Sequence, residues 1–287
     1  TIFLEWVEGK SIKEFGKVTD VHKFVSIAVQ IVSALEAIHT HRIVHRDISS
    51  DNVIVNTTTN DVKLIDFDMS KRIEAGEHDL GTTQSLEGTL HFISPEQTGN
   101  LDRPVDYRSD LYSLGVVFYY MLAGRLPFMS SDHREVVRMH LHEHATPVCE
   151  VDSNIPTPLS NLVKKLMSKL PEDRYQSAGG ILFDLRRMLA QIKTHGKIKT
   201  DFFIAKRDFL GRLQISQELY GRRNEMRTLS EAFDNVDHSD AEVVLIAGSA
   251  GTGKSALVKK FSESITENDG YFISGKYDGF NEGKPYS

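Results

Sequence analysis

An uncharged run of residues constrains the fold more than any other feature of the sequence. Residues 111–124, LYSLGVVFYYMLAG, contain no Asp, Glu, Lys or Arg. A membrane-spanning helix needs about 20 apolar residues, so this run is too short to be one. A helix without a polar face is stable only when other elements surround it. The sequence therefore predicts a helix buried in a core.

Helical and β patterns precede this run. A second helix is predicted after the N-cap signal Thr19-Asp20, because apolar side chains recur at helical spacing; they are Phe24, Ile27, Ile31, Leu35 and Ile38. Two short β-branched runs follow, NVIVN at 52–56 and VKLIDF at 62–67, and TTTND between them has the composition of a hairpin loop. After a polar stretch the chain is predicted to be helical again through Ile192.

Acidic and amide side chains fall on the loops at the ends of these elements. Asp47 and Asn52 belong to HRDISSDN at 45–52, and Asp66 opens DFD at 66–68. LEWV at 4–7 precedes them, and GTLHFISPE at 88–96 and the helical stretch SDLYSLGVVFYYMLAGRLPF at 109–128 follow them. With these motifs in this order, the chain resembles a serine/threonine protein kinase over about residues 1 to 192.

The resemblance implies a protein-kinase-like fold, of which this chain holds the hinge and the mainly helical C-lobe. The N-lobe, with its glycine-rich loop, β3 lysine and αC glutamate, is expected to lie before residue 1, because the chain opens inside the apolar run TIFLEWV. The implied function is ATP-dependent phosphorylation of a protein substrate in signal transduction. The loose transition state of that reaction is stabilised by positioning and by metal-bridged phosphate charge.

The resemblance also implies the roles of single residues. Asp47 would be the catalytic base, and Asn52 and Asp66 would bind Mg²⁺. The backbone groups of Glu5 and Val7 would bind the adenine of ATP.

Supporting residues follow from the same resemblance. Arg46 would meet a phosphorylated or acidic activation loop, Glu96 would pair with Arg174, and Asp110 would brace the catalytic loop.

Two residues depart from the kinase pattern and leave a second hypothesis open. Ser49 stands where a lysine normally contacts the transferred phosphate, and Asp68 replaces the glycine of DFG. The base and both metal ligands are retained, which favours an active kinase. The alternative is a pseudokinase that acts as an interaction or sensing module, with a second nucleotide-binding domain as the switch.

That second domain is indicated by GSAGTGKS at 248–255, which fits GxxxxGK[ST]. The apolar run EVVLIAG before it predicts a buried strand, and SALVKKFSESI after it predicts a helix. Backbone amides of such a loop hold phosphate at the helix N-terminus, the lysine reaches the phosphates, and the hydroxyl binds Mg²⁺. The predicted residues of this ATP site are Gly248, Gly251, Gly253, Lys254 and Ser255, with Ser255 as the Mg²⁺ ligand.

The order of the motifs resembles large multidomain signalling kinases, in which a kinase domain precedes an AAA-type regulatory ATPase. We expect a kinase domain at 1–192, a linker at 193–219 and the first part of an α/β P-loop ATPase domain at 220–287. The resemblance also implies that YGRR at 220–223 lies near the adenine site of the ATPase. In such proteins sensor and histidine-kinase modules often follow, and by this resemblance any such modules would lie beyond residue 287.

Composition narrows the class of protein. Lys and Arg number 34 and Asp and Glu 40, and a net charge of −6 gives no reason to expect nucleic-acid binding. The single cysteine, Cys149, cannot form an internal disulfide, which fits a cytoplasmic protein, and no membrane segment is expected in this piece. HLHEH at 140–144 matches a zinc-peptidase pattern, but without a third ligand in reach we interpret it as a polar helix face.

Overall fold

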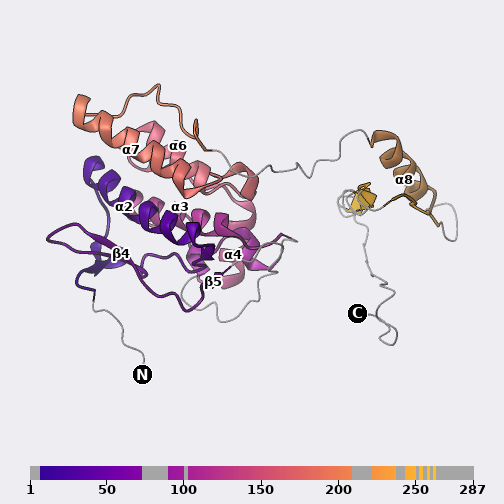
Figure 1. Cartoon of the computed structure of the whole chain (residues 1–287), viewed down its shortest axis with the longest axis horizontal. Helices are drawn as coiled ribbons and strands as arrows, with labels where there is room; N and C mark the ends of the chain where they lie inside the picture. Colours follow the sequence, from indigo (N-terminus) through magenta and orange to yellow (C-terminus); the bar gives the residue numbers. More distant parts are fainter. Residues whose placement is uncertain are drawn as a thin grey trace. The chain divides into compact units, whose positions relative to one another are not determined.

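The structure is a computed structural model that describes residues 7–72, 90–99, 103–208, 222–236, 243–249, 252–254, 257–258 and 261–262. The chain divides into two compact units, Thr1–Arg212 and Leu213–Ser287, drawn in Figure 1. Each unit is described by itself below.

In its described residues the first unit is mainly helical, with five very short strands. The strands form two antiparallel sheets, with the orders β1-β3-β4 and β2-β5. The elements in chain order are β1 Lys10–Ser11, α1 Ile12–Phe15, α2 Val21–Thr40, β2 Ile43–Val44, β3 Val53–Val55, β4 Val62–Leu64, β5 Lys71–Arg72, the 3₁₀ turns η1 Leu90–Phe92 and η2 Pro95–Thr98, α3 Tyr107–Ala123, α4 His133–His142, α5 Val148–Val151, α6 Thr157–Leu166, η3 Pro171–Asp173 and α7 Ala178–His195.

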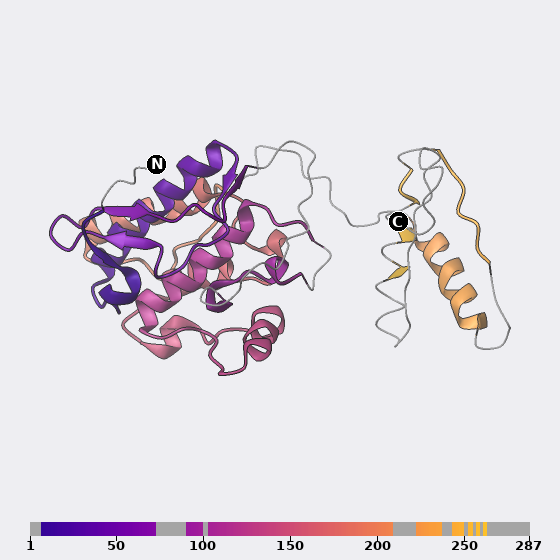
Figure 2. The same ribbon diagram turned by 90° about the horizontal axis from the view of Figure 1, so that it is seen from below.

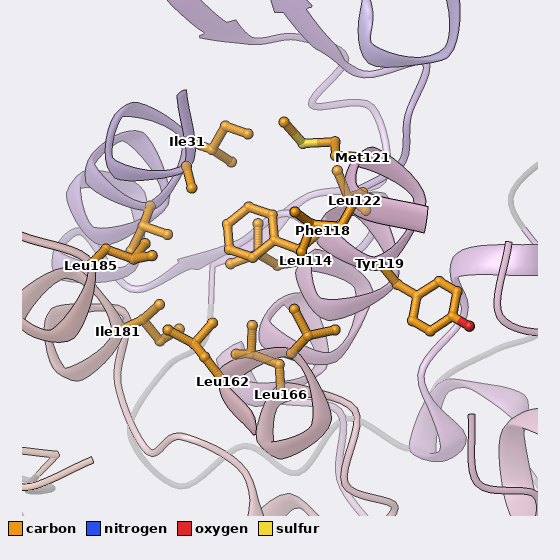
Figure 3. Packing of buried hydrophobic residues seen from close by; sticks show 14 of the residues in the cluster. Ile31, Leu114, Phe118, Tyr119, Met121, Leu122, Leu162, Leu166, Ile181 and Leu185 are labelled. Carbon is orange, nitrogen blue, oxygen red and sulfur yellow. The ribbon is translucent and has the colours of Figure 1, made fainter. Parts of the chain in front are cut away.

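Helix α3 is the centre of the core, and the predicted buried helix is confirmed. It begins after Asp106, whose side chain accepts from Arg108 N, and ends at Gly124 in the left-handed conformation. Figure 3 shows side chains of α3 meeting those of α2, α6 and α7. A β-carbon at Gly115 would lie 2.8 Å from Leu166 Cβ, so glycine is what lets α6 approach α3 so closely.

Helix α2 packs beside α3 and α7 (Figure 1). Asp20 caps its N-terminus, as predicted, by accepting from His22 N and Lys23 N. By length and composition α2 is apolar enough to cross a membrane. Its apolar side chains are instead buried in the core of this unit, namely Phe24, Val25, Ile27, Ala28, Ile31, Val32 and Leu35.

The predicted hairpin is also present. Strands β3 and β4 pair antiparallel with Val53 opposite Leu64, and β4 lies beside α2 (Figure 2). The pairing continues one step further, because Ile65 N donates to Asn52 O at 3.0 Å. This bond ties the loop before β3 to the segment after β4, and these two loops carry the predicted catalytic residues.

The segment after α7 folds back onto the first unit. Gly196 ends α7 in the left-handed conformation, and Ile198 and Phe202 are then buried in the core. Asp208 Oδ2 accepts from Gln176 N at 2.7 Å. The stretch 193–219, predicted as a linker, therefore packs on the first unit as far as Asp208 in the described part of the chain.

In the second unit, α8 spans Arg223–Val236, in agreement with the helical pattern there. Leu229 of α8 and Leu257 are both buried, and the rings of Phe233 and Phe261 lie 6.2 Å apart. The prediction of a buried strand before the glycine-rich loop is wrong for this structure, because residues 243–249 form no strand and Val243 and Leu245 are 93% and 90% exposed. A strand is buried only when neighbouring strands pair with it, and the described residues of this unit supply none.

Candidate active site

The loop between β2 and β3 is held by hydrogen bonds within itself. Asn52 Nδ2 donates to Asp47 O at 2.8 Å and to Asp47 Oδ2 at 2.7 Å. The spacing of five residues that the sequence showed thus brings the amide and the carboxylate into direct contact. The bond from Asn52 thereby fixes the orientation of one carboxylate oxygen of Asp47.

Asp110, in the first turn of α3, holds the same loop from the core side. Its two oxygens accept from His45 N at 2.9 Å and Arg46 N at 2.8 Å. His39 Nε2 lies 2.9 Å from Asp110 Oδ2. The predicted brace is therefore present, and the N-terminal end of the α3 dipole favours the negative charge of this buried carboxylate.

Two residues of the site have positive φ angles without being glycine. Arg46 has φ 68° and Asp66 has φ 64°. A non-glycine residue in this region costs about 1 kcal/mol or more and persists where its surroundings fix it. The bond from Arg46 N to Asp110 shows one such restraint.

The DFD segment contacts the loop between β2 and β3 through an aromatic pair. The ring of Phe67 lies 4.7 Å from the ring of His45, and His45 Nε2 lies 3.2 Å from Ile65 O. Asp66 follows this contact with an exposed side chain, and Asp68 N lies within 3.4 Å of Asp66 Oδ1. The carboxylate at position 68 is exposed as well.

Ser49, the serine at the position where kinases carry a lysine, is buried. Ser49 is 4% exposed, and its carbonyl accepts from Asn52 N at 3.3 Å.

The same loop carries an exposed ion pair. Lys13 Nζ lies 3.2 Å from Asp51 Oδ1, in a pair whose side chains are 64% and 53% exposed. Such an exposed pair contributes little stability, so Lys13 is free to leave Asp51 at small cost.

The predicted pair of Glu96 and Arg174 is confirmed as a bidentate ion pair in the core. Arg174 Nη1 and Nη2 donate to Glu96 Oε1 and Oε2 at 2.6 and 2.8 Å, and both side chains are buried. Ser109 Oγ also donates to Glu96 Oε1 at 2.6 Å. Burial alone would raise the pKa of Glu96, but the Arg174 guanidinium outweighs it and lowers the pKa below its ordinary value.

In the second unit, the described part of the glycine-rich loop is folded around its lysine. Lys254 Nζ donates to Gly248 O and to Ser249 O, both at 2.8 Å. Arg222 Nη2 donates to Thr252 O at 3.1 Å, so the first arginine of YGRR contacts the loop. Gly253 has φ 87°, a conformation that favours glycine.

Some predicted residues are not placed by this geometry. Glu5, Gly251 and Ser255 lie outside the described residues, and Val7 is described as half-buried. The described residues hold no group of three or more His, Cys, Asp or Glu that could bind a metal. In HLHEH, His140 is instead buried beside Tyr112, whose hydroxyl lies 3.0 Å from His140 Nδ1.

Two contacts of the site come from residues that no sequence motif singles out. His39 is the last-turn histidine of α2 that reaches Asp110, and Gln97 Nε2 donates to Arg46 O at 2.8 Å. Both bonds join segments far apart in the sequence, and neither residue type is diagnostic of a site.

Comparison with protein-family models matches residues 1–182 to the protein kinase domain. The chain belongs to this family. Residues 218–287 match the model of an AAA ATPase domain, so the kinase and ATPase matches follow each other as the motifs predicted.

Curated relatives include a hybrid signal transduction histidine kinase and serine/threonine-protein kinases. Hybrid signal transduction histidine kinase G of Dictyostelium discoideum is 30% identical over 93% of this chain and 10% of that protein. A probable serine/threonine-protein kinase of Clostridium perfringens is 37% identical over 65% of this chain and 27% of its own length. Serine/threonine-protein kinase PknB of Mycobacterium leprae is 34% identical over 65% of this chain and 30% of its own length. The chain thus spans less than a third of each of these relatives.

Proposed function

We propose that the protein is a serine/threonine kinase that transfers the γ-phosphoryl group of ATP to a protein hydroxyl, and that a nucleotide-binding ATPase unit regulates it. The observation that carries the proposal is the preformed contact of Asn52 with Asp47 on a loop braced by Asp110. Phosphoryl transfer is catalysed mainly by positioning and electrostatics, so a rigid base is what the reaction requires.

Asp47 is the residue that acts on the substrate hydroxyl in this proposal. Its carboxylate orients the hydroxyl and takes up its proton as the bond to phosphorus forms. Asn52 Nδ2 holds Asp47 Oδ2 at 2.7 Å, which prevents the carboxylate from rotating away from the incoming group.

Asn52 and Asp66 fit the magnesium that the reaction needs. Mg²⁺ prefers oxygen donors and binds through one or two carboxylates, with phosphate oxygens and water completing its coordination. An amide oxygen and one exposed carboxylate from this chain meet that requirement. The metal would neutralise charge on the β- and γ-phosphates of ATP. The backbones of Glu5 and Val7 remain the proposed adenine contacts.

The second unit is proposed to bind a nucleotide at Gly248, Gly251, Gly253, Lys254 and Ser255. Lys254 now satisfies two loop carbonyls. Phosphate oxygens would compete for its ammonium, because a charged acceptor makes a stronger hydrogen bond than a carbonyl. Binding would therefore release Gly248 O and Ser249 O and rearrange the loop.

We also infer the setting from the relatives. These relatives are named as a signal transduction histidine kinase and a serine/threonine kinase, so we place this protein in a cytoplasmic signalling pathway, with sensor or histidine-kinase modules as partners in the same protein. The boundaries 1–192, 193–219 and 220–287 stay a proposal.

The pseudokinase alternative is favoured by two specific observations. The buried Ser49 brings no cation to the transferred phosphate, and Asp68 adds an exposed negative charge next to Asp66. Both changes weaken phosphate binding, while the contact between Asn52 and Asp47 is unaffected by either.

The test is phosphate transfer from labelled ATP by the full-length protein and two variants. Asp47→Asn keeps the side-chain volume but removes the base, and we expect labelling to fall about 1000-fold or more. Asp51→Asn is the matched control, since it makes the same change on the same loop at an exposed ion pair. Equal labelling by wild type and Asp47→Asn would remove Asp47 from the mechanism, and no labelling by wild type would favour the pseudokinase.

A further inference from the structure

Gln97 connects the turn η2 to the catalytic loop. Its Nε2 donates to Arg46 O at 2.8 Å, across 51 residues of sequence. Gln97 is half-buried and follows Glu96, which is anchored in the core by Arg174. The bond therefore joins the catalytic loop to a rigid point of the fold.

The side-chain amide of Gln97 can take only one orientation here. Ser94 N and Ser94 Oγ both donate to Gln97 Oε1, at 3.2 and 2.8 Å. A flip of the amide would place its NH₂ group against the Ser94 N–H and remove the donor from Arg46 O. The two bonds from Ser94 thus direct Nε2 towards Arg46.

The bond to Arg46 O completes a set of three restraints on consecutive peptide groups. Asp110 accepts from the N–H of Arg46, which belongs to the peptide group before that residue. Gln97 holds the carbonyl of Arg46, which belongs to the peptide group that enters Asp47. Asn52 holds the carbonyl of Asp47, which belongs to the next peptide group. Without Gln97, the peptide group directly before the base would lose this restraint.

The conformation of Arg46 makes that peptide group the vulnerable one. Its φ of 68° is unfavourable for a side chain with a β-carbon. If the carbonyl is released, rotation of the peptide group towards a more favourable conformation would also turn the Cα–Cβ bond of Asp47. A displacement of about 1 Å is enough to slow a positioned reaction about 100-fold.

We propose that Gln97 is a positioning residue, which sets the orientation of Asp47 and makes phosphoryl transfer depend on the folding of the segment Ser94–Thr98. The proposal rests on the proposed kinase function. Capping of the short turn η2 accounts for the bonds to Gln97 Oε1, but it does not account for the donor bond to a loop 51 residues away.

Gln97→Glu separates the two roles of the side chain. A glutamate keeps an oxygen that accepts from Ser94, so the turn stays capped, but at neutral pH it has no proton to donate to Arg46 O. Gln191→Glu is the matched control. Gln191 Oε1 accepts from Lys199 N at 3.0 Å on α7, so this variant makes the same charge change at a similar acceptor.

The full-length protein would be assayed with ATP and a protein substrate at pH 7.5. For Gln97→Glu we expect kcat to fall about 10-fold with KM for ATP changed less than about 2-fold, because the lost restraint acts on the base. Gln191→Glu should retain the wild-type kcat. Equal kcat values in the two variants would overturn the proposal.

Hydrogen exchange supplies a readout that does not depend on activity. The peptide covering residues 45–52 should exchange faster in Gln97→Glu than in Gln191→Glu, whereas unchanged exchange in both variants would overturn the proposal. The exchange measurement also tests the role of Gln97 separately from the proposed kinase function. Absence of transfer by the wild type would remove the proposed function, while the exchange of this peptide would still decide whether Gln97 restrains the loop.

Discussion

Gly180→Ala is predicted to break the hydrogen bonds by which Asp208, at the end of the segment after α7, is attached to the residues that precede α7. Asp208 Oδ2 accepts from Gln176 N at 2.7 Å, and Oδ1 accepts from Ser177 Oγ at 3.2 Å. A β-carbon at position 180 would lie 2.4 Å from Asp208 Oδ1 and 2.8 Å from its Cγ. Real β-carbons do not come so close to other atoms, so the carboxylate of Asp208 must move away and give up both bonds.

The change in the free energy of unfolding caused by Gly180→Ala follows from two opposing effects. The two hydrogen bonds to a charged acceptor contribute about 3 kcal/mol together. Alanine in a helix is more favourable than glycine by about 1 kcal/mol. The free energy of unfolding should therefore fall by about 2 kcal/mol, which lowers the midpoint of thermal unfolding by about 6 °C for a unit of this size.

Gly179→Ala is the control for calorimetry of the same chain. A β-carbon there would lie 2.8 Å from Glu36 Oε1, the end of a flexible side chain that can move aside. This variant should be neutral or slightly more stable than the wild type. In an Asp208→Gly background the whole side chain that crowds position 180 is gone, including its β-carbon, and Gly180→Ala should no longer destabilise. The reasoning is refuted if Gly180→Ala unfolds at the same temperature as Gly179→Ala, or if its cost persists without the Asp208 carboxylate.

Three further predictions concern other parts of the chain. Arg174→Met leaves Glu96 buried without its partner, so the free energy of unfolding measured with urea should fall by about 3–5 kcal/mol. A variant in which apolar residues replace both Arg174 and Glu96 should regain most of that stability. Burial, assisted by the charge of Lys169, lowers the pKa of His140 to about 3 from 6.5, so the unfolded chain binds the proton first as pH falls. The free energy of unfolding should therefore fall by up to about 1.4 kcal/mol per pH unit below pH 6.5. His140→Asn should make the free energy of unfolding depend less on pH, and an unchanged slope in this variant would contradict the role assigned to His140. Lys254→Ala should remove ATP binding at the glycine-rich loop, so that calorimetry on the full-length protein detects one nucleotide site fewer than in the wild type. Arg227→Ala on α8 should remove neither site, and an equal number of sites in both variants would contradict the P-loop assignment.

The sequence was sufficient for the helical core because helical periodicity is local. The uncharged run at 111–124 and the apolar spacing from Phe24 to Leu35 each specify a buried helix within one element. The strand predicted before the glycine-rich loop failed for the opposite reason. Its burial depends on pairing with other strands, and the local pattern at 243–249 contains no information about those partners.

The segment after α7 shows a second limit of local patterns. Residues 196–208 have no period and a mixed composition, which resembles a linker. They are held by two buried apolar side chains, Ile198 and Phe202, and by the carboxylates of Asp184 and Asp208. Ala205 N donates to Asp184 Oδ2 at 2.5 Å. A few well-placed contacts fix a segment that periodicity cannot detect.

The first turn of α3 explains why the predicted and the unpredicted site residues belong together. Ser109 donates to Glu96 at 2.6 Å, and the next residue, Asp110, accepts from the backbone of Arg46 at 2.8 Å. Glu96 is followed by Gln97, which returns to the carbonyl of Arg46. Two adjacent residues on the central helix thus hold two segments, and those segments are also bonded to each other. Because α3 is buried and closely packed, its first turn cannot shift freely. A substitution of any of these residues should therefore change the orientation of the neighbouring Asp47 rather than be absorbed locally.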